Sequence, residues 1–138
     1  MPSIEVALCD AGPLIALFSE GQYAQDQCQE VLKTRRLRLV ATLPVLAEAF
    51  YFVARPSERE ALWNFMRGGV FHIAETLPDD LLRMRDLMRK YADLPMDFAD
   101  ASLVATGERL NVFRIFTLDR RHFAVYRSHQ RRAFETFP

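Results

Sequence analysis

Four acidic residues occupy positions in this sequence where a purely structural role would favour an apolar side chain. Asp10 and Asp119 each end a run of apolar residues. Glu48 and Asp100 each interrupt a stretch of helical spacing that is otherwise small or apolar. Buried carboxylates repel one another and are costly to desolvate, so a site that gathers several of them needs a cation to offset their charge. Oxygen ligands alone favour Mg²⁺ or Mn²⁺.

Each of these acids also has a structural alternative. Asp10 suits a helix N-cap, as does Asp97, and Asp119 suits the start of a turn. Glu48 is the only charge in its eleven-residue stretch. An exposed stripe on such a helix would need about three polar positions, so a functional role is favoured for Glu48. Asp100 lies three residues after Asp97, on the same helix face, and its small neighbours favour an inward-facing ligand.

Apolar runs alternate with amphipathic stretches along the chain, and glycine and proline residues separate them. Strands that alternate with helices predict right-handed crossovers and a mainly parallel sheet of four to five strands with helices on both faces. Ligands gather at the carboxyl ends of such strands, where Asp10 and Asp119 lie. Ser57 and Glu60 predict a capping box. The expected strands are 4–9, 37–41, 70–74, 112–117 and 133–137, and the expected helices are 12–18, 22–34, 44–54, 58–67, 78–91 and 97–110.

Length and composition indicate a single domain over residues 1–138, half of them apolar. Apolar runs fall well short of the roughly 20 residues that cross a bilayer, and the N-terminus lacks the pattern of a signal peptide. Cys9 and Cys28 lack motif spacing, which indicates reduced thiols, with one disulfide as the alternative. We therefore expect a cytoplasmic protein with no membrane association.

Charge is distributed unevenly, although the formal net charge is zero. Residues 1–30 contain five acids and no Lys or Arg, whereas residues 111–138 contain six Arg. Arg is a good bidentate ligand for phosphate. The alternative is a set of solvated faces in a chain encoded by a GC-rich genome. The candidates for contact with nucleic acid are Arg114, Arg120, Arg121 and Arg127.

Other chemistries find less support in the sequence. The three histidines lack metal-ligand spacing, and neither a glycine-rich phosphate loop nor a nucleophile–base pattern is present. A phosphoacceptor receiver domain would need paired acids after the first strand and a late lysine. The chain has only Asp10 at that position, and no lysine follows Lys90.

Four segments, in order, resemble the PIN-domain family, and specifically the VapC-like ribonuclease toxins of type II toxin–antitoxin systems. They are Leu8–Leu17, Leu46–Ala49, Met88–Ala101 and Ile115–Phe123, and together they span essentially the whole chain. The resemblance implies an α/β/α sandwich and an endoribonuclease that depends on Mg²⁺ or Mn²⁺. It also implies a homodimer and a small antitoxin partner.

By motif, Asp10, Glu48, Asp100 and Asp119 match the catalytic, metal-holding acids of the family. Thr117 matches a small hydroxyl position beside the last acid, and Asp97 matches an accessory acid. The chain departs from the family at two positions. Ala11 replaces a frequent Ser or Thr, and His122 stands where some members place the last acid.

The expected reaction is hydrolysis of an RNA phosphodiester, with one or two divalent ions held by the acids. Either Glu48 or Asp100 would assist as the base. Because an all-acid site repels RNA, the C-terminal Arg residues would supply the opposing field. The alternative from another class is a PIN-like module that binds RNA or protein without cleaving it.

Overall fold

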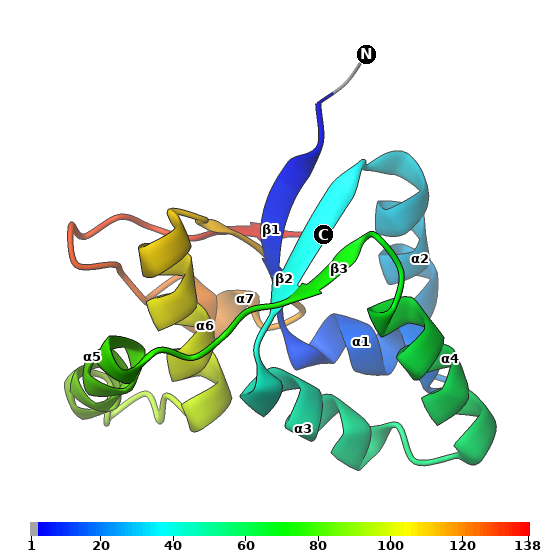
Figure 1. Cartoon of the computed structure of the whole chain (residues 1–138), viewed down its shortest axis with the longest axis horizontal. Helices are drawn as coiled ribbons and strands as arrows, with labels where there is room; N and C mark the ends of the chain where they lie inside the picture. The colour runs from blue at the N-terminus through cyan, green and yellow to red at the C-terminus, as the bar shows by residue number, and fades with distance from the viewer. Residues whose placement is uncertain (1–2) are drawn as a thin grey trace.

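The computed structural model describes residues 3–138, which form a five-stranded sheet with helices on both sides (Figure 1). The strand order is β3-β2-β1-β4-β5, and every neighbouring pair is parallel. The predicted α/β class with a mainly parallel sheet is therefore confirmed. The strands are β1 (Glu5–Cys9), β2 (Leu37–Ala41), β3 (Phe71–Ile73), β4 (Arg114–Phe116) and β5 (Glu135–Phe137).

Seven helices connect these strands within the described residues. They are α1 (Ala11–Phe18), α2 (Gln25–Thr34), α3 (Leu43–Phe52), α4 (Pro56–Met66), α5 (Pro78–Lys90), α6 (Phe98–Leu110) and α7 (Arg120–Phe123). In Figure 1, α2 and α4 lie on one side of the sheet and α5 and α6 on the other, while α1 and α3 continue from the carboxyl ends of β1 and β2. No helix in residues 3–138 is long and apolar enough to cross a membrane.

One local prediction was wrong. The capping box of Ser57 and Glu60 does not form, because α4 begins two residues earlier than expected, after Arg55, with Pro56 in its first turn. Proline suits that position because its fixed φ is already helical and it has no N–H to leave unpaired. After Asp119, where a turn was the structural alternative, the chain forms the short helix α7, and Asp119 is its N-cap.

The centre of the sheet is buried on both faces, as continuous apolar strands predict. Ala7, Leu8 and Cys9 of β1 have no exposed surface, and β1 pairs with both β2 and β4. The pairing of Cys9 with Phe116 brings the carboxyl ends of β1 and β4 side by side, and the N–H of Asp10 donates to the carbonyl of Phe116 at 2.9 Å. Segments that are distant in the chain therefore end at one edge of the sheet.

Helix α6 approaches β1 closely at Gly107, and small residues make up much of its buried face. A Cβ atom added at Gly107 would lie 2.7 Å from the carbonyl oxygen of Val112 and 2.9 Å from a methyl group of Leu8. The helix ends at Asn111, whose left-handed conformation (φ 57°) is a common helix terminator. This close packing fixes the position of α6 relative to β1.

Candidate active site

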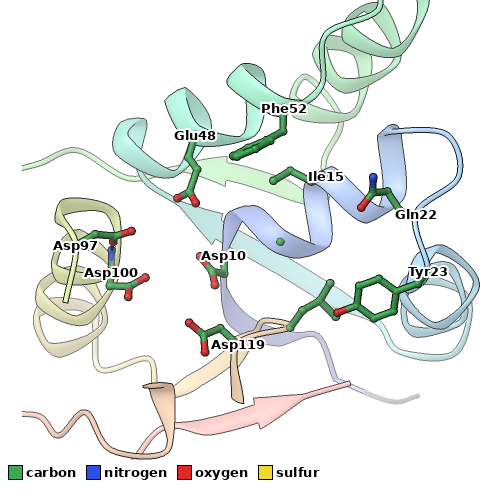
Figure 2. A pocket seen from close by; sticks show the side chains of 11 residues that line it. Asp10, Ile15, Gln22, Tyr23, Glu48, Phe52, Asp97, Asp100 and Asp119 are labelled. Atoms are coloured by element: carbon green, nitrogen blue, oxygen red, sulfur yellow. Dashed lines mark hydrogen bonds between the residues drawn. The ribbon is translucent and has the colours of Figure 1, made fainter. Parts of the chain in front are cut away.

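A pocket of about 500 Å³ opens at the carboxyl edge of the sheet (Figure 2). Five acidic residues line one half of it, and they come from α3, α6 and the ends of β1 and β4. Apolar and aromatic residues line the other half. The complete set is Asp10, Gly12, Ile15, Gln22, Tyr23, Glu48, Phe52, Asp97, Asp100, Leu118 and Asp119.

Asp10 lies at the centre of the acidic half and is only 8% exposed. Its Oδ1 accepts a hydrogen bond from the N–H of Ala11 at 2.8 Å, which caps α1, and its Oδ2 accepts from Oγ1 of Thr117 at 2.7 Å. Burial raises the pKa of Asp10, the two hydrogen bonds lower it, and Asp119 and Asp97 raise it further. Asp10 thus follows the end of β1 and also caps α1.

Thr117 connects the ends of the two central strands. Besides donating to Asp10, its Oγ1 accepts a hydrogen bond from the N–H of Asp119 at 2.9 Å. The carboxylate of Asp119 also contacts Nδ1 of His122, at 2.9 Å from Oδ1 and 2.8 Å from Oδ2. The motif drew attention to His122 only as a replaced acid, and the structure places its imidazole on Asp119.

Asp97 and Asp100 share the first turn of α6. Asp97 caps the helix through a 2.7 Å hydrogen bond from the N–H of Asp100 to its Oδ1. The hydroxyl of Tyr126 donates to Oδ2 of Asp100 at 3.0 Å. Sequence reasoning missed Tyr126, because it lies 26 residues from Asp100 in a segment without regular periodicity.

The pKa of Asp100 shows the combined effect of burial and of repulsion among the acids in the pocket. Burial raises the pKa of Asp100 to about 8, with further increases from Asp10, Asp97 and Asp119, while the hydrogen bond from Tyr126 lowers it. Without a cation, the pocket therefore favours the protonated form of Asp100. A bound cation would favour the ionised form and reverse this effect.

Glu48 reaches the same pocket from α3 and points toward the other acids (Figure 2). It is half-buried, and burial raises its pKa, with Asp97 and Asp10 adding to the increase. Within the described part of the chain, the side chain of Glu48 makes no hydrogen bond. Asp10, Asp100 and Asp119 are each held by a protein donor, so Glu48 is the untethered acid.

The donor set suits a hard divalent cation, although the side chains are not arranged as a finished site. No group of three or more His, Cys, Asp or Glu side chains in residues 3–138 is positioned to hold an ion as it stands. All candidate donors are carboxylate oxygens, and no Lys or Arg from the described residues lines the pocket. Each carboxylate has about four lone-pair sites, so Asp10 retains capacity beyond its two hydrogen bonds.

The four arginines expected to contact nucleic acid are spread over two edges of the sheet. Arg120 and Arg121 are exposed on α7, directly after Asp119, and Arg127 follows that helix. Arg114 lies at the amino end of β4, where it forms ion pairs with Glu5 at 3.1 Å and Glu135 at 3.5 Å. Three of these arginines therefore follow β4 in the chain, and none of the four lines the acidic pocket.

Comparison with known proteins identifies the family. The family model of the PIN domain matches residues 7–128 of the sequence, so this chain belongs to the PIN-domain family. Within that family it is similar to ribonuclease VapC26 of Mycobacterium tuberculosis, with 28% identity over 123 residues that cover 87% of this chain and 91% of the relative.

Solved structures share the fold. The VapC20 toxin of Mycobacterium tuberculosis, which cleaves the sarcin–ricin loop, superposes with a TM-score of 0.71 at 14% identity, covering 82% of this chain and 87% of that one. A toxin–antitoxin complex from Klebsiella pneumoniae gives 0.66 at 21% identity, covering 86% and 91%. VapBC2 from Rickettsia felis, bound to a DNA fragment from its promoter, gives 0.66 at 11% identity, covering 96% and 99%. The resemblance to VapC-like toxins is confirmed.

Proposed function

We propose that this protein is a divalent-metal-dependent endoribonuclease that hydrolyses RNA phosphodiester bonds and is the toxin of a toxin–antitoxin pair. The observation that carries the proposal is the meeting of five carboxylates from four separate parts of the chain in one pocket. Membership of the PIN-domain family and similarity to a VapC ribonuclease support the nuclease assignment. Asp10, Glu48, Asp100 and Asp119 are the proposed catalytic, metal-holding residues, with Asp97 as an accessory acid.

When bound, Mg²⁺ or Mn²⁺ would lower the pKa of a water molecule and stabilise charge on the phosphate. The protein orients the acids that surround the reacting phosphate: Thr117 holds Asp10, and Tyr126 holds Asp100. Glu48 is the proposed acceptor of the proton from the attacking water, because its carboxylate is not tethered by a protein donor. Asp100 is the second candidate for this role, because burial raises its pKa and so strengthens its affinity for a proton.

We further propose that the protein acts in the cytoplasm, forms a homodimer and is inhibited by a small antitoxin. The structural relatives described as toxin–antitoxin assemblies support the antitoxin. The exposed apolar groove of α5 and α6, lined by Leu81, Met84, Met88 and Phe98 among others, is a suitable place for subunit contact. Light scattering of the purified chain, alone and with the product of a neighbouring short gene, tests both partners.

Cleavage of RNA by the purified protein tests the main proposal. An end-labelled single-stranded RNA should be cut internally with Mg²⁺ or Mn²⁺ and remain intact with EDTA. The Asp100→Asn variant, checked for folding by circular dichroism, should not cut. Binding of RNA without any cleavage by the unsubstituted protein would instead support the non-catalytic PIN-like module.

A further inference from the structure

The acidic pocket has a second half whose chemistry the acids do not explain. Ile15, Phe52 and Leu118 line it, and Tyr23 and Gln22 stand at its rim (Figure 2). Tyr23 is 91% exposed and Phe52 is 55% exposed, so neither ring serves the core. Exposed aromatic rings beside a polar centre are typical of a ligand-binding surface.

Electrostatics limits what can hold an RNA strand here. None of the residues that line the pocket in the described chain is basic, and five of them are acids. A phosphate that enters is repelled unless a cation accompanies it. Affinity within the pocket must therefore come partly from contacts that do not depend on charge, and stacking of bases on aromatic rings is the main contact of that kind.

The geometry of α3 relates the two halves. Glu48 and Phe52 are four residues apart on this helix, so both face the pocket with their Cβ atoms about 5–6 Å apart. The ring of Tyr51 lies edge-on to that of Phe52, with the centroids 5.0 Å apart, and supports it. A phosphate beside the acids would thus have its own or the next base within reach of Phe52.

We propose that the apolar half is a subsite for an unpaired nucleobase next to the scissile phosphate. The base stacks on the rings of Phe52 and Tyr23, and the amide of Gln22, which can both donate and accept, contacts the base edge. This inference rests on the proposed ribonuclease function. The base must be unpaired, because the faces of paired bases are covered by their neighbours in the stack.

Binding to RNA with and without the base tests the subsite. In the Asp100→Asn background, which leaves RNA uncut, we expect Tyr23→Ala and Phe52→Ala each to weaken binding of an unstructured oligoribonucleotide about tenfold. The Asp100→Asn protein should bind the same oligonucleotide with abasic residues about as weakly as the alanine variants bind the intact one. On the abasic oligonucleotide, neither Tyr23→Ala nor Phe52→Ala should weaken binding further. Fluorescence anisotropy with Mg²⁺ present measures all of these affinities.

Two controls separate stacking from general disturbance. Trp63→Ala removes an aromatic ring that is 51% exposed on α4, outside the pocket, and should leave both affinities unchanged. Tyr23→Phe keeps the ring and should retain binding. Equal losses on intact and abasic RNA, or no loss with either alanine variant, would overturn the subsite and leave these rings as a surface for a protein partner.

The outcome is independent of the test of the ribonuclease function. If the unsubstituted protein cleaves RNA but binding shows no dependence on the base, the subsite fails and the ribonuclease stands. If binding depends on the base but cleavage is absent, the ribonuclease fails and the subsite stands as an RNA-binding site.

Discussion

Three acids in the pocket are each held by a side chain that carries a hydroxyl or imidazole group. Thr117 holds Asp10, Tyr126 holds Asp100, and His122 holds Asp119, at separations between 2.7 and 3.0 Å. Groups that orient metal ligands in this way typically affect metal affinity or activity by 10- to 100-fold, on the order found for outer-shell partners. At the scale of residues, the site therefore includes Thr117, Tyr126 and His122 as well as the acids that they hold.

Replacement of Asp100 by Asn should separate activity from stability. We expect cleavage to fall at least about a hundredfold, because the substitution removes a proposed cation ligand. Stability in EDTA above about pH 8 should be equal or higher, because at that pH Asp100 carries a charge that Asp10, Asp97 and Asp119 repel, whereas Asn carries none. Thermal unfolding and cleavage of one RNA measure the two effects. A variant that unfolds more easily yet cleaves normally per folded molecule would make Asp100 a structural residue.

Tyr126→Phe should reveal the positioning role of the hydroxyl. The ring remains packed between Tyr91 and Phe123, so folding should be retained. Without the hydrogen bond to Asp100, we expect about tenfold more Mn²⁺ to be needed for half-saturation, measured by calorimetry as well as by cleavage.

Tyr91→Phe is the matched control for Tyr126→Phe. It removes a neighbouring hydroxyl that accepts from the N–H of Arg127 and does not line the acidic pocket. Equal Mn²⁺ affinity in the Tyr126→Phe variant and the unsubstituted protein would show that Asp100 needs no such support.

At the scale of elements, α6 is the support on which the site depends. It carries Asp97 and Asp100 at its first turn, and it packs against the sheet through small residues that end at Gly107. Because the acids of β1 and α6 must face each other across the pocket, a displacement of this helix would change the separation of Asp10 from Asp100.

Gly107→Ala tests how tightly that packing is set. The added methyl group would lie within 3 Å of a carbonyl oxygen of Val112 and a methyl group of Leu8, and we expect destabilisation of about 1–3 kcal/mol. Gly69→Ala, where nothing lies within 4 Å of the added atom, should change the free energy of unfolding by less than about 0.5 kcal/mol. Urea unfolding of both variants provides the comparison, and equal stabilities would show that α6 moves freely enough to accommodate the methyl group.

At the scale of the whole molecule, the gathered acids couple folding to pH. The pKa of Asp100 is about 8 in the folded chain, against about 4 in an unfolded chain. Between these values the folded state keeps a proton that the unfolded state releases, so stability falls as pH rises through this window.

We therefore expect the metal-free protein to have a lower Tm at pH 8 than at pH 5.5. The Asp100→Asn variant should show a flatter dependence, and Mg²⁺ should raise the Tm of the unsubstituted protein more at pH 8 than at pH 5.5, because cations compete with protons for the same carboxylates. Differential scanning calorimetry in EDTA and in Mg²⁺ measures these shifts. Parallel pH profiles for the two proteins would rule out Asp100 as the source.

Local sequence patterns determined the elements of this fold and most of the acids. Apolar runs predicted the strands, helical spacing predicted six of the helices to within a few residues, and the positions of Asp10, Glu48, Asp100 and Asp119 identified the acids that share the pocket. These signals are local, because burial of one face imposes a period on neighbouring residues. Where local signals competed, as at Ser57, the neighbouring proline decided the helix start.

Only the tertiary structure decided which distant side chains meet. The pairing of β1 with β4 unites Thr117 with Asp10, and the path of the chain after α7 brings Tyr126 to Asp100. It also places Phe52 in the apolar half of the pocket. Such contacts leave no periodic trace in the sequence, because they depend on strand order and helix packing, which the whole core sets at once.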